Sequence, residues 1–512
     1  MNVSSSTEVF YITTPIYYVN DVPHIGHAYT TVAADVVARY QRLLGRQVFF
    51  LTGTDEHGMK IEKTAEQRGM SSQELVDEVV ERFQHLWQVL NISHDDFIRT
   101  TEERHARSVT AFFEKVRENG DIYLGTYEDW YCIPCETFWT VNQLEDGNCP
   151  ECGRPAERVK EESYFFRMSR YRERLLAYIE EHPDFIQPPA KRNEILSFIR
   201  EELRDLSISR TSFSWGIPVP GDDKHVIYVW FDALINYLTA AGYPDGDRFS
   251  QVWPADIHLI GKDILRFHAV YWPTFLFAAG LPLPRKVFAH GWWTVEGEKM
   301  SKSRGNVVDP VAVADEYGVD SFRYFLLREV PFGLDGDFSR AAMKGRLNSD
   351  LANDLGNLFS RSIAMIGKYR QGKVPVPDPA DQRYEEFSRL AAEIFAEVST
   401  GMEDLAFSKV LQAIWRLVVK GNKFIDQQAP WQLAKDEAKA GELDQVLYCI
   451  AEALRLITAY LLPFMPERAG EMMRQLGLTM EHFSRGAEIF SWGQMPPGTV
   501  VEKGKSLFPR LD

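Results

Sequence analysis

The most restrictive feature of the chain is the change of apolar pattern along its first 58 residues. Residues 8–18, EVFYITTPIYY, are rich in β-branched and aromatic side chains, which predicts a buried strand that stops at Pro15 and runs into a loop. Residues 27–45 place apolar side chains at helical spacing and end in glycine, which predicts a helix. Residues 47–58 predict a second buried strand, ending at Gly53.

A strand, a helix and a second strand in this order predict a parallel pair with a right-handed crossover. Side chains that follow such strands, here Asp55 and His57, lie at the edge where open α/β sheets bind ligands. Apolar runs at residues 225–238 and 257–280 resume the pattern after an insertion that spans residues 115–214. We therefore expect an α/β fold, a Rossmann-like doubly wound parallel sheet split by an insertion.

After Phe338 the pattern is helical, and strand signals nearly vanish. Apolar side chains recur at helical spacing in residues 348–366, 407–426 and 443–464. A proline-rich loop at residues 372–382 separates the first two of these stretches. The sequence predicts a separate all-α domain here.

Charge limits the partners of the chain. Its 512 residues include 57 basic and 73 acidic side chains, so the formal charge is −16. Bulk charge therefore disfavours nonspecific binding to DNA or another polyanion, and any nucleic-acid surface must be a local basic patch. The first residues resemble neither a signal nor a transit peptide, and no apolar run has membrane-spanning length. We expect a multi-domain cytoplasmic protein with no membrane and no DNA as partner.

Four of the five cysteines form two close pairs, in the motifs CIPC and CPEC, with 13 residues between the pairs. Four thiolates at such spacing suit tetrahedral zinc with no open coordination position, so the metal would be structural. Disulfides or idle thiols are the alternative, and a reducing compartment disfavours disulfides. The sequence predicts one zinc ion, held by Cys132, Cys135, Cys149 and Cys152.

Two short motifs indicate phosphate chemistry. Residues 24–27, HIGH, put two imidazoles at the turn into the first helix, where backbone and histidine N–H donors suit an anion. Residues 299–303, KMSKS, put Lys299 and Lys302 on a hydrophilic loop that can close over a triphosphate. Either motif alone is compatible with a solvated turn, but both together on one doubly wound sheet favour nucleotide binding.

HIGH and KMSKS are the paired signatures of the class I aminoacyl-tRNA synthetases, and within that class the chain resembles the methionyl-tRNA synthetases of bacterial type with one zinc knuckle. Six segments are similar to that family's, in its order and over essentially the whole chain: TTPIYYVNDVPHIGH, TGTDEHGMKIEKTA, YVWFDALINYL, HLIGKDILRFHAVYWP, NDLGNLFSR and PWQLAK. The resemblance implies that His24, His27, Lys299 and Lys302 are the catalytic, charge-handling groups. It implies an ATP site formed by His24, Gly26, His27, Gly261, Trp293, Lys299, Met300, Ser301 and Lys302.

The resemblance also implies a methionine pocket. Its residues would be Ile16, Tyr18, Asp55, Trp230, Ala233, Leu234, Tyr237, Ile264 and His268. Asp55 would hold the substrate ammonium group, and Trp230, Tyr237 and His268 would line the thioether, whose polarizable sulfur packs well on rings. Leu234 departs from the proline of some relatives. Such a pocket distinguishes one methylene by only ~1–3 kcal/mol, so homocysteine should compete.

For the helical domain, the resemblance implies recognition of the CAU anticodon by Asn357, Arg361, Pro430 and Trp431. Unpaired bases are recognised by stacking on aromatic side chains and by hydrogen bonds to their edges. Asn357 and Arg361 are four residues apart and therefore share one helix face. Without the resemblance, a solvated helix and a core tryptophan would be an equally good interpretation.

We expect five parts along the chain: residues 1–114 (first half of the Rossmann catalytic domain), 115–214 (insertion with the zinc knuckle), 215–284 (second half), 285–350 (KMSKS loop and linking region) and 351–512 (α-helical anticodon-binding domain). The chain ends where the family's catalytic and anticodon-binding parts end, so we expect a monomer.

The implied activity is ATP-dependent activation of L-methionine to methionyl-adenylate with release of pyrophosphate, then transfer of the methionyl group to the 3′ end of initiator and elongator tRNA(Met). Mg²⁺ would accompany ATP. One alternative is a nucleotidyltransferase of the same fold that activates a carboxylate without tRNA, and a charging assay would distinguish it. The other is a tRNA-binding paralogue without catalysis, whose mark would be failure to bind ATP.

Overall fold

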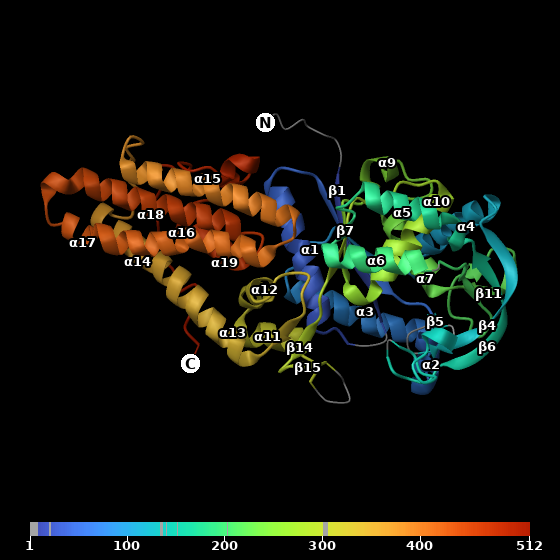
Figure 1. Cartoon of the computed structure of the whole chain (residues 1–512). Coiled ribbons are helices and arrows are strands. Elements are labelled where there is room, and N and C mark those ends of the chain that lie inside the picture. The colour runs from blue at the N-terminus through green and yellow to red at the C-terminus, as the bar shows by residue number, and fades with distance from the viewer. Residues whose placement is uncertain are drawn as a thin grey trace. The chain divides into compact units, whose positions relative to one another are not determined.

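The computed structural model describes residues 9–19, 22–133, 137–139, 141–150, 152–201, 203–300 and 306–511. The chain forms two compact units, whose elements are labelled in Figure 1. The first unit comprises Met1–Pro23, Val48–Trp87 and His94–His290, and the second comprises His24–Gln47, Gln88–Ser93 and Gly291–Asp512. The first helix, α1 (Ile25–Leu43), thus groups with the C-terminal half of the chain rather than with the strands that flank it in sequence.

The first unit is built on a six-stranded sheet in which all neighbouring strands are parallel. Across the sheet the strands are β3 (Asp96–Arg99), β2 (Val48–Asp55), β1 (Phe10–Tyr18), β12 (Ile257–Gly261), β13 (Val287–His290) and β7 (Ile186–Gln187). The order of winding reverses between β1 and β12, and such a switch point is where open α/β sheets bind ligands. The Rossmann-like parallel sheet expected from the sequence is confirmed.

Strand β1 does not stop at Pro15, as the sequence pattern predicts, but continues to Tyr18. Its pairing with β2 shifts register between Thr13 and Ile16 and then resumes, so that Tyr18 pairs with Asp55. Proline has no N–H to donate, and it is tolerated where a bulge interrupts the ladder. Strand β2 also ends at Asp55, two residues later than expected, so the end of β1 and the end of β2 stay paired up to the candidate site.

Helices and two small sheets complete the first unit. Its helices are α2 (Met59–Arg68), α3 (Ser72–Val89), α4 (Glu103–Glu118), α5 (Arg172–Glu181), α6 (Pro189–Glu201), α7 (Val229–Leu234), α8 (Asn236–Ala241), α9 (Phe249–Val252) and α10 (Trp272–Ala279). One small sheet has the order β10 (Pro218–Val219), β11 (Asp222–Ile227), β9 (Ser209–Arg210), and the other has β5 (Thr137–Trp139), β4 (Ile122–Cys132), β6 (Glu157–Phe166), β8 (Leu206–Ser207). The insertion also supplies β7, the edge strand of the main sheet, which the sequence pattern did not indicate.

The core of the first unit joins sheet residues such as Tyr11 and Leu51 to helix residues such as Phe112 and Phe275, all of them fully buried. Burial of a side chain of this size stabilises the fold by roughly 1.5–3 kcal/mol. The carboxyl ends of the strands are therefore held on a rigid base.

In its described residues, the second unit is helical apart from a small sheet of the order β15 (Glu298–Lys299), β14 (Trp293–Val295), β16 (Gly336–Phe338). After α1, its helices are α11 (Pro310–Tyr317), α12 (Val319–Arg328), α13 (Arg340–Arg346), the π-helix η7 (Leu347–Gly356), α14 (Asn357–Arg370), α15 (Gln382–Glu403), α16 (Phe407–Gln428), α17 (Pro430–Leu433), α18 (Ala440–Leu461) and α19 (Pro466–Gln475). Figure 1 shows α15, α16 and α18 side by side. Beyond Phe338 the described residues form no further strand, which confirms the helical domain. Among the described residues, no helix combines the length and the apolar character that crossing a bilayer requires.

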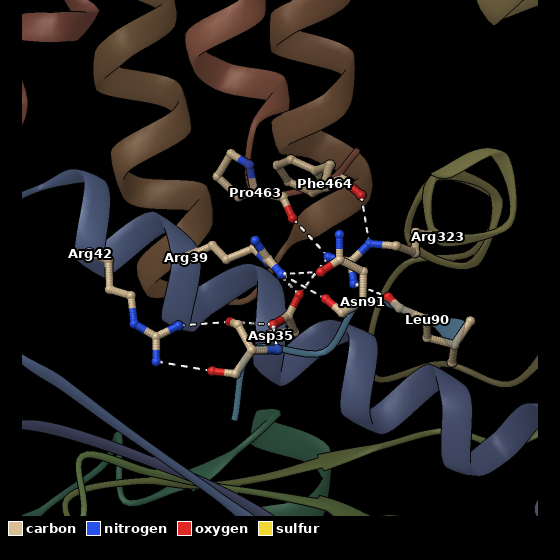
Figure 2. A network of polar contacts seen from close by, with 9 residues as sticks. Asp35, Arg39, Arg42, Leu90, Asn91, Arg323, Pro463 and Phe464 are labelled. Atoms are coloured by element: carbon tan, nitrogen blue, oxygen red, sulfur yellow. Dashed lines mark hydrogen bonds and ion pairs between the residues drawn. The ribbon is translucent and has the colours of Figure 1, made fainter. Parts of the chain in front are cut away.

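A buried ion pair joins three segments of the second unit. Arg323 on α12 donates to the carboxylate of Asp35 on α1 at 2.7 Å, and neither side chain is exposed. The same guanidinium donates to the backbone oxygens of Leu90, Pro463 and Phe464, as Figure 2 shows. A buried charge is costly unless it is paired and hydrogen-bonded, and these contacts supply its partners. Arg323 therefore connects α1 to the residues that follow α18, and we call this set of contacts the Arg323 joint.

Candidate active site and metal centre

The N-terminus of α1 is formed by two histidines that cap each other. His24 is the N-cap residue, and its Nδ1 accepts a hydrogen bond from the Gly26 backbone N–H at 3.1 Å. The Nδ1 of His27 accepts from the His24 backbone N–H at 3.1 Å, and the two rings stack with centroids 3.8 Å apart. A Cβ on Gly26 would lie 3.0 Å from the His24 ring, so glycine suits this close approach.

This arrangement decides the tautomer of both rings. Because each Nδ1 accepts a hydrogen bond, the ring proton of the neutral imidazole sits on Nε2. Burial and the neighbouring His24 hold the pKa of His27 well below its ordinary value, so this ring stays neutral at pH 7. Each ring therefore has an Nε2–H donor near the N-terminus of α1, where the helix dipole also favours an anion.

Other elements of the second unit meet the start of α1. The Ile25 backbone N–H donates to the Val308 carbonyl at 3.3 Å. Tyr29, one turn along the helix, contacts the Trp293 ring edge-on at 5.4 Å, and Trp293 is 3% exposed on β14. The chain on both sides of the expected KMSKS loop is thus close to the HIGH motif.

The loop itself is only partly described. Lys299 ends β15, where it pairs with Thr294 of β14, and Met300 is half-buried. Ser301 and Lys302 lie outside the described residues. The roles expected for Lys299, Met300, Ser301 and Lys302 stay predictions.

Three residues of the expected methionine pocket, Ile16, Tyr18 and Asp55, lie together in the first unit. Ile16 and Tyr18 lie in the last three residues of β1, where they pair with Gly53 and Asp55 of β2. The Val19 N–H donates to the Asp55 carbonyl at 3.2 Å, and the Asp55 residue is 7% exposed. The structure therefore brings a buried carboxylate to the carboxyl end of the sheet, as the sequence predicts.

Aromatic rings expected to line the thioether come from three short elements of the same unit. Trp230 on α7 stacks on Phe267 with centroids 3.5 Å apart and planes 6° apart. The Tyr237 hydroxyl on α8 lies 2.7 Å from Nε2 of His268, and Nδ1 of His268 lies 3.0 Å from the Ile264 carbonyl. Since the carbonyl can only accept, Nδ1 carries the proton and Nε2 accepts from Tyr237.

His268 lies in a π-helical turn, Phe267–Tyr271, of the kind often found at functional sites. Burial lowers the pKa of His268 to about 4, so the ring is neutral at pH 7. Gly261, which is expected in the ATP site, ends β12. Ala233 and Leu234, two further residues of the expected methionine pocket, are buried in α7. Together with the aromatic rings they offer an uncharged lining suited to an apolar side chain with a polarizable atom.

Three of the four expected zinc ligands converge. The ligand atoms of Cys132, Cys149 and Cys152 all lie within 4.8 Å of one another, and the sulfurs of Cys132 and Cys152 are 3.5 Å apart. Tetrahedral zinc with bonds of about 2.3 Å separates its sulfur ligands by about 3.8 Å, so the three thiols fit such an ion. Cys135 lies outside the described residues, and none of the described cysteines forms a disulfide.

The residues expected to read the anticodon lie on two helices of the second unit, α14 and α17. Asn357 begins α14, and its side-chain amide donates to Asn422 Oδ1 on α16 at 3.3 Å. Arg361, one turn later, donates to the Asp426 carboxylate at 2.7 Å. The sequence interpretation did not single out Asn422 and Asp426, although their own spacing of four residues matches that of the pair they contact.

Next to these helices, α17 begins at Pro430, which is buried, while Trp431 is 40% exposed. Ala429 before them has φ 46°, a left-handed conformation that ends α16 and turns the chain. An indole held this way on a short helix has an exposed surface on which a base could stack.

The parallel sheet with its switch point, the imidazole pair that begins α1 and the helical C-terminal half are together those of a class I aminoacyl-tRNA synthetase. A sequence model described as "tRNA synthetases class I (M)" matches residues 10–160 and 152–363, and one described as "Anticodon binding domain of methionyl tRNA ligase" matches residues 376–512. The chain belongs to the methionyl-tRNA ligase family of this class.

Individual relatives are similar to this chain over nearly its full length. The methionine–tRNA ligase of Caldanaerobacter subterraneus is 55% identical over 507 residues, which are 99% of this chain and 79% of that protein. That of Clostridium tetani is 52% identical, over 99% of this chain and 79% of that protein. The structure of Mycobacterium tuberculosis methionyl-tRNA synthetase in complex with methionyl-adenylate has a TM-score of 0.94 and 45% identity, covering 98% of this chain and 100% of that one. The free state of the mycobacterial enzyme has a TM-score of 0.87 and 41% identity, covering 99% of this chain and 98% of that one.

Proposed function

We propose that this protein activates L-methionine with ATP and transfers the methionyl group to the 3′ end of initiator and elongator tRNA(Met). The observation that carries the proposal is the start of α1, where Nδ1 of His24 and of His27 accept backbone N–H groups, which puts the ring protons on Nε2 beside a helix N-terminus. It is supported by the full-length likeness to a mycobacterial relative whose structure contains methionyl-adenylate.

In the first step, a carboxylate oxygen of methionine attacks the α-phosphorus of ATP, and the bond from that phosphorus to the bridging oxygen breaks. Pyrophosphate leaves with the bonding electrons, so negative charge grows on the phosphate oxygens. His24, His27, Lys299 and Lys302 stabilise that charge, and Gly26, Gly261, Trp293, Met300 and Ser301 complete the nucleotide site. Mg²⁺ bound to ATP would neutralise part of the same charge.

In the second step, a hydroxyl of the terminal ribose of tRNA attacks the methionyl carbonyl carbon, and AMP leaves. No protein nucleophile takes part, because both steps depend on positioning and on charge stabilisation. Asp55 binds the ammonium group of methionine. The side chain of methionine contacts Ile16, Tyr18, Trp230, Ala233, Leu234, Tyr237, Ile264 and His268.

In the proposal, residues 351–512 read the CAU anticodon, through Asn357, Arg361, Pro430 and Trp431. The nearby contacts of Asn357 with Asn422 and of Arg361 with Asp426 support this role, because they orient both side chains before tRNA arrives. The protein acts in the cytoplasm as a monomer.

The zinc proposal assigns one ion to Cys132, Cys135, Cys149 and Cys152. The convergence of three of these thiols supports it. With four thiolate ligands the ion would have no open position, so its role is to hold the insertion together rather than to activate a substrate.

The test is exchange of labelled pyrophosphate into ATP, run without tRNA and with methionine, leucine, isoleucine, cysteine or no amino acid. We expect exchange with methionine alone, followed by methionine charging of a transcript with a CAU anticodon. Exchange with another amino acid would contradict the pocket assignment, and exchange without charging would favour the nucleotidyltransferase alternative. Absence of exchange from folded, zinc-containing protein would contradict the proposal as a whole.

A further inference from the structure

A buried carboxylate in the first unit, Asp232, links two parts of the proposed methionine pocket. Asp232 lies on α7, between Trp230 and Ala233, and it is fully buried. One oxygen accepts from Nδ1 of His57 at 2.6 Å, and the other accepts from Nε2 of His105 at 2.7 Å. His57 follows the end of β2, two residues after Asp55, and His105 lies on α4.

The segment around Asp55 is held by contacts of its neighbours. Glu56 is fully buried, and its carboxylate accepts from the Arg99 guanidinium at 2.7 Å and from Thr101 at 2.5 Å. The Trp215 indole N–H donates to the Glu56 carbonyl at 2.6 Å. With Glu56 and His57, the two residues that follow Asp55, both held by buried contacts, the backbone after Asp55 has little freedom to shift.

The contacts of Asp232 on the side of His105 and α7 are equally well held. His105 Nδ1 lies 3.2 Å from the Thr239 hydroxyl on α8, the helix that also carries Tyr237. Phe231, beside Asp232, packs edge-on against Phe112 of α4 at 5.8 Å. The carboxylate of Asp232 therefore joins α4, α7 and the end of β2, and through His105 it also reaches α8.

We propose that Asp232, His57 and His105 are positioning residues that set the distance between the ammonium-binding carboxylate and the side-chain end of the methionine pocket, and thereby its selectivity for side-chain length. This inference rests on the proposed function. The three side chains bind no part of the substrate themselves. They hold Asp55 on one side and Trp230, Ala233 and Leu234 on the other.

The negative charge of the Asp232 carboxylate strengthens its hydrogen bonds to His57 and His105. A carboxylate without partners inside a protein is costly, and burial by itself raises the pKa of Asp232. The contacts with His57 and His105 outweigh burial, so the pKa of Asp232 lies below its ordinary value and the group is ionised at pH 7. Hydrogen bonds to an ionised acceptor are stronger and shorter than neutral ones, so a small shift of α7 against β2 is opposed.

The first test compares Asp232→Asn with the unchanged protein. An asparagine keeps the shape but loses the charge and one acceptor, so we expect the Kd and KM of methionine to rise ~10-fold or more, since misplacement of a binding group by about 1 Å can cost ~10²-fold. The KM of ATP should change less than about twofold, because Asp232 bonds to His57 and His105 and neither is a candidate ATP residue. The ratio of kcat/KM for methionine to that for homocysteine should fall.

Asp121→Asn is the matched control. Asp121 is another carboxylate of the first unit, 2% exposed, that accepts from the Tyr171 hydroxyl at 2.6 Å and from Arg170 at 3.0 Å. We expect this variant to lower thermal stability without changing methionine affinity or selectivity. If Asp232→Asn and Asp121→Asn have the same effects, Asp232 is only structural and the inference is overturned.

Conservative replacements give a second, independent test. His57→Asn keeps a donor close to the position of Nδ1, and His105→Gln keeps one close to the position of Nε2. We expect each to recover most of the methionine affinity that His57→Ala or His105→Ala loses. Failure of both replacements to recover it, in variants that remain folded, would also overturn the inference.

These outcomes are distinct from failure of the proposed function. If the unchanged protein binds methionine and Asp55→Asn abolishes that binding, the pocket assignment holds whatever Asp232 does. If the unchanged protein does not bind methionine, both the proposed function and this inference fall.

Discussion

At the start of α1, His24 and His27 each use Nδ1 to accept a backbone N–H and carry the ring proton on Nε2. The Nδ1 atoms satisfy backbone N–H groups of the first helical turn, which would otherwise lack partners. The capping contacts therefore select the tautomer with the proton on Nε2. A capping role and a catalytic role are combined in one residue, and substitutions can separate them.

We expect His24→Asn to separate the two roles. Asparagine is among the best N-cap residues and can accept from the Gly26 N–H, so the free energy of unfolding should change by less than about 1 kcal/mol. It lacks the Nε2–H, so the rate of methionine-dependent pyrophosphate exchange should fall ~10²–10³-fold. Exchange kinetics and urea unfolding measure the two effects.

His24→Ala serves as the control, because it loses both functions. Its free energy of unfolding should fall by ~0.5–2 kcal/mol in addition to the loss of exchange. Normal exchange by His24→Asn would show that the Nε2–H takes no part in catalysis.

Asp320 is a residue whose charge opposes folding at neutral pH. It accepts from the Arg468 N–H at 2.6 Å and so caps α19, but burial raises its pKa from 3.8 to about 6. A carboxyl with a raised pKa binds its proton more tightly in the folded state, so its stabilising effect is present at low pH and is lost as pH rises through about 6. The cost at pH 7 and above is about 3 kcal/mol.

Asp320→Asn carries no charge at any pH. We expect the free energy of unfolding of this variant, relative to the unchanged protein, to increase between pH 4 and pH 7 by up to about 3 kcal/mol. Urea unfolding at a series of pH values measures the difference. A difference that does not depend on pH would mean that Asp320 titrates normally in the folded protein.

At the scale of elements, irregular positions and the ends of helices and strands place most of the candidate site side chains. The bulge at Pro15 lets β1 reach Tyr18 beside Asp55, and the π-helical turn presents His268 to Tyr237. Arg323 attaches α1 to the end of α18 and to the segment after α3. Local deviations from regular structure thus occur where side chains must be aimed.

The Arg323 joint predicts a large loss of stability when one partner is removed. Arg323→Met leaves Asp35 buried without one of its two arginine partners, and we expect the free energy of unfolding to fall by ~3–5 kcal/mol. Asp35→Asn should cost a similar amount, and the double variant should cost less than the sum of the two. Urea unfolding followed by helical circular dichroism measures all three.

The control is the pair of Arg340 and Glu316, whose side chains are 56% and 47% exposed. Because water screens such a pair, Arg340→Met should cost less than about 1 kcal/mol. Equal costs for Arg323→Met and Arg340→Met would contradict the role of the joint.

Removal of zinc should first affect the cysteine knuckle of the insertion. The core around the knuckle among the described residues is small, with Cys132, Trp139, Cys149 and Leu144 in contact, so it depends on the ion. We expect a chelator to release one zinc per chain and to increase amide hydrogen exchange in the residues that connect β4 to β6. The amides of α15, α16 and α18 should keep their protection.

Cys149→Ser should reduce the zinc content in the same way. Cys449→Ser is its control, because Cys449 is buried in α18 beside Gln445 and should not change the zinc content. Metal analysis together with hydrogen exchange checks both, and a protein that contains no zinc when purified without chelator would contradict the assignment.

At the scale of the whole molecule, the two compact units carry different parts of the proposed reaction. The candidate methionine residues belong to the first unit, whereas His24, His27, Trp293 and the candidate anticodon residues belong to the second. The candidate anticodon residues lie on α14 and α17, which carry none of the candidate ATP or methionine residues. Substitutions there should affect tRNA without affecting methionine activation.

Trp431→Ala tests this separation. Stacking of a base on an aromatic ring contributes ~1–3 kcal/mol, so we expect the KM for tRNA to rise ~5- to 150-fold while pyrophosphate exchange is unchanged. Val376→Ala, at a site that is 74% exposed in the same unit, should change neither. An equal loss of exchange and charging by Trp431→Ala would mean that the tryptophan supports the fold rather than the anticodon.

Local patterns in the sequence sufficed for the strand, helix and strand at the start, for the helical C-terminal half and for the family. They also indicated the candidate residues in HIGH and in the cysteine pairs, because each of these motifs is short, and the roles of these residues stay predictions. Contacts between distant residues are different: Asp35 meets Arg323, and His57 meets Asp232, only after the chain has folded. Nothing near any of these residues in sequence specifies its partner.

Tertiary packing therefore decided the rest. It decided that β1 passes through Pro15, that the insertion lends β7 to the main sheet, and that α1 groups with the helical half. Each of these depends on which surfaces bury one another and on which charges are left to be paired inside. Burial is a property of the whole fold, so a window of a few residues can show which chemistry is present but not which partners it will meet.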